Sequence, residues 1–365
     1  MKILMITVAK MDKGGIESYL MSLVRNFDHK NIHVDFVVHR QEKGGYEEEI
    51  NSWGSKIYKL PRLSKHPIKY VKELLHVIKS GGYDIVHRHA TASVMWIDLA
   101  IAKWAGVNIR IAHSHSSNWR IRWLHYLFRP LLKHYATDCF ACSEKAGRWM
   151  YGDNRFVVMH NGIHIPNFTY SSAVREQYRK ILNLETKRVI IHVGRLVPVK
   201  NHEWIIQIAE EMKNENVIFL FAGDGQLKQH LETMVKDKNL QEKVLFLGKR
   251  NDISGLMMAS DVLLLPSKFE GMPVTLIEAQ CCGLPCIVSE NVTKEVDMGL
   301  VSFLPYDLLS WKNMIMEIKN SDSNRKNAYL KIEENNYSDN ATARIMLAYY
   351  YERYQKIKER GGDLE

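Results

Sequence analysis

Two glutamates eight residues apart, Glu270 and Glu278, bracket a stretch whose residue types could bind an anion and a hydroxylated ligand. Gly271 lets the backbone turn, and Pro273 suits the first position of a helix, where its missing N–H costs nothing. The unpaired N–H groups and the positive dipole end at a helix start attract anions. We therefore predict a ligand site formed by Glu270, Gly271, Met272, Pro273 and Glu278.

Three other loops place glycines, cations and an amide where predicted strands end. Four apolar runs predict these strands, at residues 188–193, 217–222, 244–247 and 262–265. The carboxyl ends of parallel strands share one edge of a sheet, and open α/β sheets bind ligands there. Arg195 can make a forked contact to phosphate oxygens, and Lys200 a point-charge contact. The other candidates in these loops are Gly223, Asp224, Gly225, Arg250 and Asn251.

The spacing of the two glutamates argues against glycoside hydrolysis. If most of the intervening steps are helical, the two carboxylates start roughly 10–12 Å apart along the axis. The acid and base of a glycosidase lie about 5–9.5 Å apart. A glutamate inside the helix is better placed to bind hydroxyl groups beside a phosphate. With the neighbouring cations, this arrangement indicates a nucleotide diphosphate site.

Two glycines and two histidines are the candidates in the first half of the chain. Gly14 and Gly15 separate a predicted strand (1–8) from a helical pattern, which would point backbone N–H groups at a phosphate. His113 and His115 follow another predicted strand. Two interpretations stay open: these histidines are polar residues satisfied by the backbone, or they bind a ligand at the end of the strand. A metal site is the least favoured, because no cysteine or carboxylate lies nearby at ligand spacing.

The alternation of strands and helices predicts an α/β protein with two parallel, doubly wound sheets. At 365 residues the chain exceeds the size at which one core usually stops growing. The alternation breaks at Ile165-Pro166-Asn167 and restarts after a helix at 174–181. We predict domains at 1–166 and 167–340 and a tail at 341–365 with a last helix. After Asn291 no further element is assigned before that helix.

The net charge of +9 arises in one region. From Arg62 to His134 there are twelve lysines and arginines and three acids, so the rest of the chain is neutral overall. Such a patch suits a phosphate-bearing partner or an anionic membrane surface. Nucleic acid is the least favoured partner, because no known recognition pattern accompanies the charge.

Residues 119–133, inside this basic region, combine aromatic and basic residues at helical spacing. Trp119, Trp123, Tyr126, Leu127 and Leu131 share one side, and Arg122, His125, Arg129 and Lys133 share another. This pattern is typical of a helix in a membrane interface. It also fits a surface helix that packs its aromatics on its own domain, and we prefer this second interpretation.

The cysteines and the apolar runs indicate a cytoplasmic protein. The five cysteines are odd in number and no secretory signal opens the chain. Cys139 and Cys142 form a C-x-x-C motif without a second pair, so neither a metal nor a redox role is predicted. Asp98 and Lys103 interrupt the best apolar run, and none approaches the ~20 residues of a membrane span.

Three motifs in order resemble the signature of glycosyltransferase family 4: Gly-Arg-x(4)-Lys-Asn at 194–201, Ala-Gly-Asp-Gly at 222–225 and Glu-x(7)-Glu at 270–278. Gly14-Gly15-Ile16-Glu17 and Asn161-Gly162-Ile163 extend the resemblance over essentially the whole chain. Met5-Ile6-Thr7-Val8 and the 112–116 loop are most similar to bacterial capsular and exopolysaccharide transferases. The resemblance implies the GT-B fold, with two Rossmann-like domains facing a cleft and a terminal helix crossing back to the first.

The resemblance also implies roles for the candidates. Arg195 and Lys200 would hold the donor diphosphate and stabilise the leaving group. Glu270 would bind the sugar hydroxyls and Glu278 the ribose. The remaining contacts would be backbone N–H groups of Gly15, Gly271 and Met272, Arg250 near the base, and His115 at the reacting centre with His113 as its competitor.

Together these expectations describe a retaining glycosyltransferase that moves a sugar from a nucleotide-diphosphate donor, a UDP-sugar, to a lipid-linked saccharide in capsule or exopolysaccharide biosynthesis. No metal is expected, because the GT-B pattern is metal-independent and no Asp-x-Asp motif occurs in a plausible loop. The expected place is the cytoplasm, at the inner face of the membrane. Two alternatives stay open: a nucleotide-sugar hydrolase or epimerase of the same fold, and a non-catalytic sugar-nucleotide-binding subunit.

Overall fold

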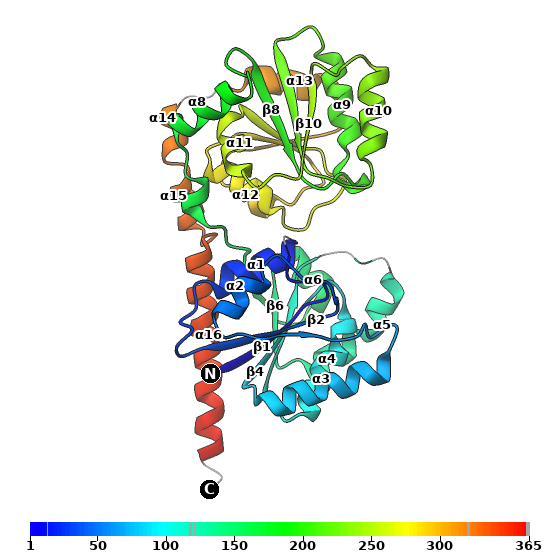
Figure 1. The fold of residues 1–365 in the computed structure, drawn as a ribbon, viewed down its shortest axis with the longest axis vertical. Helices are drawn as coiled ribbons and strands as arrows, with labels where there is room; N and C mark the ends of the chain where they lie inside the picture. Colours follow the sequence, from blue (N-terminus) through cyan, green and yellow to red (C-terminus); the bar gives the residue numbers. More distant parts are fainter. Residues whose placement is uncertain (13, 117–118, 120, 320–321, 363–365) are drawn as a thin grey trace. The chain divides into compact units, whose positions relative to one another are not determined.

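The computed structural model describes residues 1–12, 14–116, 119, 121–319 and 322–362. The chain forms two compact units, one of Met1–Gly162 with Asp339–Glu365 and one of Ile163–Ser338 (Figure 1). The boundaries expected from the sequence, after residues 166 and 340, lie four and two residues further along the chain than these.

The first unit is built on a seven-stranded parallel sheet with strand order β3-β2-β1-β4-β5-β6-β7. Its strands are β1 (Lys2–Ile6), β2 (His33–Val38), β3 (Ile57–Lys59), β4 (Ile85–Ala90), β5 (Ile109–Ser114), β6 (Asp138–Ala141) and β7 (Val157–Val158). The central strands are buried on both faces because helices cover both sides of the sheet, although β4 and β5 also carry polar side chains.

Helices cover the two faces of this sheet in the order that the sequence alternation predicts. They are α1 (Gly15–Val24), α2 (Glu47–Ser52), α3 (Pro67–Gly81), α4 (Trp96–Trp104), α5 (Arg122–Tyr135), α6 (Glu144–Tyr151) and α16 (Asp339–Gly362), with a short η1 turn (Ser93–Met95). One face packs against α1 and α16 in a single core. On the other face α3 and α5 pack against α4, which contacts β4 and β5.

The last helix, α16, belongs to the first unit although it follows the second in sequence. Ala343, Met346 and Tyr350 enter the core beside α1 and the sheet. The Tyr350 hydroxyl lies 2.5 Å from His87 Nδ1, and the Tyr349 hydroxyl donates to Asp138 at 2.5 Å. These contacts dock the helix on the sheet.

The second unit has a six-stranded parallel sheet with strand order β10-β9-β8-β11-β12-β13. Its strands are β8 (Arg188–Val193), β9 (Val217–Ala222), β10 (Val244–Gly248), β11 (Val262–Leu265), β12 (Cys286–Ser289) and β13 (Val301–Leu304). The apolar runs expected at β8, β9, β10 and β11 are all strands, which confirms the doubly wound α/β fold class.

Two hydrophobic cores sandwich this second sheet, one on each face. The helices on one face are α7 (Ile165–Phe168), α8 (Ser172–Ile181), α11 (Ile253–Ala259), α12 (Val274–Cys281) and α15 (Tyr329–Glu334). Those on the other face are α9 (His202–Glu211), α10 (Lys228–Asp237) and α13 (Leu308–Glu317). The shorter elements are η2 (Pro198–Lys200), η3 (Lys294–Val296) and α14 (Asp322–Lys326).

Candidate donor site at the strand ends of the second unit

The stretch with the two glutamates forms the junction between β11 and α12, as the sequence predicts. The helix begins at Val274, and Pro273 is its N-cap with an extended backbone, one position earlier than expected. The N–H groups at this helix start therefore follow directly after Gly271, Met272 and Pro273 in the chain.

The structure brings Lys200 and Glu270 together from two different loops. Their Nζ and Oε1 atoms lie 2.5 Å apart, and both side chains are largely buried, at 17% and 16% exposure. The Ser267 hydroxyl donates to the same carboxylate oxygen at 2.8 Å. The backbone also joins the two loops, because the Lys268 N–H donates to the Val199 carbonyl at 2.8 Å. The sequence predicts that both charges lie at one edge of the sheet. It does not predict their direct contact or the hydrogen bond from Ser267 to Glu270.

Glu278 differs from Glu270 in having no counter-ion. Its side chain is half-buried on α12 and makes no hydrogen bond or ion pair with any residue that the structure describes. Burial raises the pKa of Glu278 to about 7, because desolvation disfavours the carboxylate. A ligand hydroxyl beside it would supply the missing hydrogen bond.

The glycines of the neighbouring loops leave no room for a side chain, because backbone carbonyl groups lie against them. A Cβ atom on Gly223, whose φ is +151°, would lie 1.9 Å from the Gly194 carbonyl oxygen. A Cβ atom on Gly225 would lie 2.5 Å from the Leu196 carbonyl oxygen. Asp224 accepts a hydrogen bond from the Gly225 N–H at 2.8 Å. These residues fix the loop next to Arg195 and Lys200, which accounts for the glycines without any ligand.

The two arginines among the candidates have different surroundings. Arg195 is exposed, and its guanidinium has no hydrogen-bond partner in the part of the chain that the structure describes. Arg250 is engaged in a forked ion pair with Asp252, with N–O distances of 2.8 and 2.6 Å, and that pair raises its pKa. Arg195 is thus free for an anion, whereas Arg250, which precedes Asn251, would have to exchange Asp252 for a ligand.

At the start of the first unit, Gly14 and Gly15 lie at the beginning of α1. A Cβ atom on Gly14 would lie 2.2 Å from Oε2 of Glu17, whereas no described atom lies within 4 Å of a Cβ on Gly15. Glu17 is buried in the first helical turn and accepts a hydrogen bond from Thr7 at 2.8 Å. Gly14 is therefore explained by local packing, and Gly15 is not.

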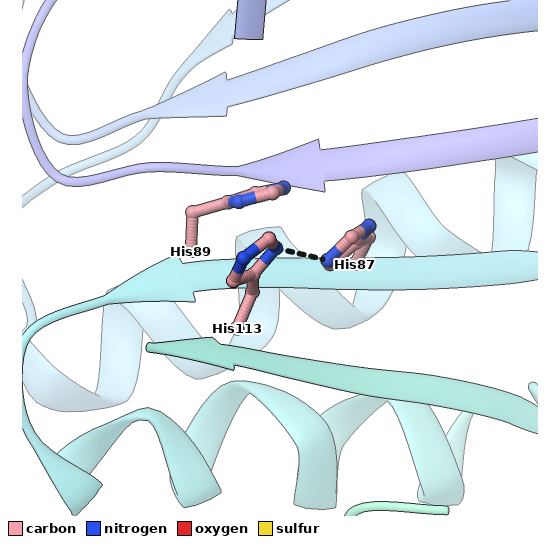
Figure 2. Close-up of side chains that lie close together, drawn as sticks. All are labelled: His87, His89 and His113. Atoms are coloured by element: carbon pink, nitrogen blue, oxygen red, sulfur yellow. Dashed lines mark hydrogen bonds between the residues drawn. The ribbon is translucent and has the colours of Figure 1, made fainter. Parts of the chain in front are cut away.

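His113 and His115 belong to a block of four histidines that the sequence analysis did not assemble. Because β4 and β5 are neighbours, His87 and His89 meet His113 and His115 on one face of the sheet. Figure 2 shows His87, His89 and His113. The His87 and His113 rings hydrogen-bond at 3.2 Å, and those of His89 and His115 at 3.0 Å. The repeated His-x-His pattern on adjacent strands was the available signal.

Burial keeps the four imidazoles neutral. It lowers the pKa of every one, to about 3 for His115, because a buried ring loses the hydration of its charged form. His113 is fully buried, whereas His115 is partly exposed at the end of the strand. Of the two competing candidates, His115 is the one with an exposed part, but its Nδ1 atom is buried without a partner and its Nε2 atom bonds to His89.

The nitrogen atoms of His87, His89 and His113 lie within 4.8 Å of one another, so these three residues could hold a metal ion. Such an ion would have to replace one of the two hydrogen bonds of His87, the one to Tyr350 or the one to His113 that Figure 2 shows. The ring centroids of His87 and His89 are 4.1 Å apart in a stacked arrangement. The hydrogen bonds among these histidines already pair some of their ring nitrogens without a metal ion.

Helix α5 presents its apolar side to solvent, which contradicts the preferred interpretation of residues 119–133. Trp123 is 69% exposed and Leu127 is 59% exposed. The buried side is formed instead by His125 and Leu132. His125, grouped with the basic residues in the sequence analysis, stacks on Trp149 with centroids 4.2 Å apart. Among the described residues, no helix is both long and apolar enough to cross a membrane.

Comparisons with known proteins agree with this architecture. The model of "Glycosyltransferase Family 4" matches residues 13–165, and that of "Glycosyl transferases group 1" matches residues 174–297. The candidate glycosyltransferase EpsF of Bacillus subtilis is 36% identical over 306 residues, which cover 80% of this chain and 79% of EpsF.

One further relative and one solved structure are also similar to this chain. The UDP-Gal:alpha-D-GlcNAc-diphosphoundecaprenol alpha-1,3-galactosyltransferase of Escherichia coli is 34% identical over 61% of this chain and 62% of its own length. The crystal structure of Anabaena HepE in complex with UDP and glucose shares the fold, with a TM-score of 0.79 and 18% identity over 96% of this chain and 99% of HepE. With its two parallel-sheet units and these matches, the chain is a glycosyltransferase with GT-B-type units and belongs to glycosyltransferase family 4.

Proposed function

We propose that this glycosyltransferase transfers a sugar from a UDP-sugar, with retention of the anomeric configuration, to a lipid-linked saccharide during capsule or exopolysaccharide biosynthesis. The observation that carries the donor assignment is the contact between Lys200 and Glu270. The unpaired carboxyl group of Glu278, on the helix that follows Glu270 in sequence, adds to it. The UDP complex of HepE and the UDP-galactose donor of the Escherichia coli relative support UDP as the nucleotide.

In this proposal each charged side chain meets the part of the donor that its chemistry suits. The ammonium group of Lys200 and the guanidinium of Arg195 bind the diphosphate and offset the negative charge that grows as the bond from the sugar to the phosphate breaks. Glu270 accepts hydrogen bonds from sugar hydroxyls while keeping Lys200 in place. Glu278 binds the ribose hydroxyls, and the N–H groups after Gly271 bind the sugar phosphate.

The proposed step needs no protein nucleophile. The acceptor hydroxyl oxygen forms a bond to the anomeric carbon on the same face from which the diphosphate leaves. The hydroxyl proton passes to a phosphate oxygen of the leaving UDP, and His115 contacts the transferred sugar as a neutral hydrogen-bonding group. The reaction as written takes no metal ion, so we expect full activity in excess EDTA.

A donor panel tests this assignment. We expect UDP, and UDP-sugars more than ADP- or GDP-sugars, to raise the melting temperature of the protein. Ligand at 100 times its dissociation constant should stabilise the protein by about 2.7 kcal/mol. Release of UDP should require the acceptor, because rapid release without it would identify a nucleotide-sugar hydrolase instead.

Replacing Gly15 with alanine should lower transfer at least tenfold without lowering the melting temperature. No described atom is close enough to clash with the new methyl group, and alanine favours a helix more than glycine does. The loss would arise because the methyl group occupies the place of a substrate phosphate oxygen. Steady-state rates and thermal unfolding measure the two effects, and unchanged rates would remove Gly15 from the site.

We further propose that α5 lies on an anionic membrane surface, at the inner face of the cell membrane. Its exposed apolar residues are flanked by Arg122, Arg129 and Lys133, and a helix of this kind binds through apolar burial and attraction to anionic lipid. The Escherichia coli relative is named for a diphosphoundecaprenol-linked acceptor, and an enzyme that uses such an acceptor would act at a membrane surface. Nucleic acid has no place in the proposal.

The double variant Trp123→Ser/Leu127→Ser should bind vesicles of anionic lipid at least roughly tenfold more weakly than the natural protein, because two exposed apolar side chains no longer enter the interface. Vesicle sedimentation at low salt measures this. The matched control is Ile181→Ser/Leu309→Ser, which removes two equally exposed apolar residues of the second unit. Equal binding by both variants would contradict the assignment of α5.

A further inference from the structure

The first unit contains a cavity of about 310 Å³ at the carboxyl ends of β1, β2 and β4. This volume is at the lower end of the range for small-molecule sites, roughly 300–1,000 Å³. Its wall combines cationic and apolar side chains, including Arg62, Arg88, Val8, Leu63, Met95 and Trp119. None of these residues belongs to the candidate donor site.

Arg88 is a buried cation whose guanidinium is only partly satisfied. It is 5% exposed; its Nε atom donates to Asp98, and Nη1 donates to the carbonyls of Ile6 and His89. Its Nη2 atom has no hydrogen-bond partner among the described residues, and the side chain lines the cavity. Nη2 is thus the donor that this side chain can offer to a ligand acceptor in the cavity.

A network behind Arg88 holds it in this position. The Asp98 carboxylate also accepts a hydrogen bond from the Tyr70 hydroxyl at 2.6 Å, and that hydroxyl lies 3.0 Å from His39 Nε2. Burial lowers the pKa of His39 to about 4, so its ring is neutral. Arg88 and Asp98 balance each other, which leaves the network without net charge.

Arg62 adds an uncompensated positive charge to the same cavity. It lies on the loop after β3, is half-buried, and its side chain has no hydrogen bond or ion pair within the described residues. Two guanidiniums with free donors on one small cavity match the oxygen atoms of a phosphate or diphosphate group.

The apolar part of the cavity wall is connected to the buried side of α5. The η1 turn, which supplies Met95 to the wall, packs against this helix. The Ser93 N–H donates to His125 Nδ1 at 3.1 Å, and the Ser93 hydroxyl donates to the His125 carbonyl at 2.6 Å. The cavity for an anion therefore adjoins the helix that exposes Trp123 and Leu127.

We infer that this cavity binds the diphosphate of the lipid-linked acceptor, with Arg62 and Arg88 as binding residues and Asp98, Tyr70 and His39 as positioning residues. The inference rests on the proposed function for the nature of the acceptor. It gives the protein two diphosphate sites, one for the donor in the second unit and one for the acceptor in the first.

A binding experiment with the whole protein tests this site without relying on catalysis. The probe is geranyl diphosphate, a short water-soluble prenyl diphosphate, titrated in a calorimeter with UDP at saturation so that the donor site is filled. We expect one bound probe per chain. Arg62→Ala should weaken binding at least roughly tenfold, because a hydrogen-bonded charge is lost. Arg88→Lys, which keeps the charge but loses the fork, should weaken it as well.

The control variant is Lys65→Ala, which removes an exposed cation from the same loop outside the cavity wall and should bind like the natural protein. Inorganic pyrophosphate should bind more weakly than geranyl diphosphate, and geraniol should not bind. Absence of probe binding with UDP present, or equal binding by Arg62→Ala and the natural protein, would overturn the inference. The donor assignment would survive that result, because it is tested separately by the nucleotide panel.

Discussion

Replacing Lys200 with alanine should lower kcat about a hundred- to a thousandfold while the protein remains folded. In the proposed site the Lys200 ammonium group offsets the charge on the departing diphosphate, so its loss acts on the transition state more than on donor binding. Glu270 would lose its counter-ion at 2.5 Å but would keep the hydrogen bond from Ser267. The melting temperature should therefore fall by only a few degrees.

A lysine in an exposed ion pair provides the matched control for Lys200. Lys228 lies 3.9 Å from Glu232 on α10 of the same unit, and both side chains are 47% exposed. Its replacement by alanine should leave kcat and the dissociation constant for UDP unchanged. If Lys200→Ala kept a rate within a few-fold of the natural enzyme, the diphosphate would not be bound as proposed.

Replacing Arg325 with alanine should destabilise the second unit by roughly 3 kcal/mol or more. Arg325 is 2% exposed and stacks over the ring of Tyr170 at 4.3 Å. Its guanidinium donates to four carbonyls near the ends of α11 and α12, those of Met257, Met258, Ser260 and Cys282, at 3.0–3.2 Å. Alanine would leave these buried acceptors unpaired and would also open a cavity.

Urea unfolding followed by tryptophan fluorescence measures this loss, with the transition of each unit fitted separately because two units need not unfold together. Lys326, the exposed neighbour on α14, is the control, and Lys326→Ala should change the unfolding free energy by less than about 0.5 kcal/mol. A loss below about 1 kcal/mol for Arg325→Ala would mean that the helix ends do not depend on this side chain.

The central strands and the donor loops were predictable because their sequence signals are local. Fully apolar runs such as 262–265 favour a buried strand, because they are too short for a helix and helical patterns flank them. The loops after such strands must then share one edge of the sheet. The proximity of Lys200 and Glu270 was therefore predictable from the shared strand edge of an α/β sheet, and the two side chains do meet.

The region after Asn291 was not predictable for the opposite reason. Strand β13 is an edge strand of four half-buried residues, and α14 and α15 are only five and six residues long. Short elements carry too little periodicity to be recognised. Their position depends on distant contacts, such as those of Arg325 with the ends of α11 and α12.

The surroundings of individual side chains were also not predictable from the sequence. The sequence of α5 fits two surroundings, and only the structure distinguishes the buried His125 from the exposed Trp123. The contact between Lys200 and Glu270 and the histidine block likewise depend on which strands are neighbours. Alternation predicts that strands are parallel, but the strand order that creates these clusters is a property of the whole sheet.

The most direct test of the central claim is a time-resolved proton NMR experiment with the purified protein, a UDP-sugar of α configuration and a saccharide acceptor on a prenyl diphosphate. The account predicts an α-linked product that appears together with one equivalent of UDP, and no UDP release when the acceptor is left out. A β-linked product would contradict retention. Free sugar and UDP formed at the same rate without acceptor would contradict the transferase assignment of the Lys200 and Glu270 site.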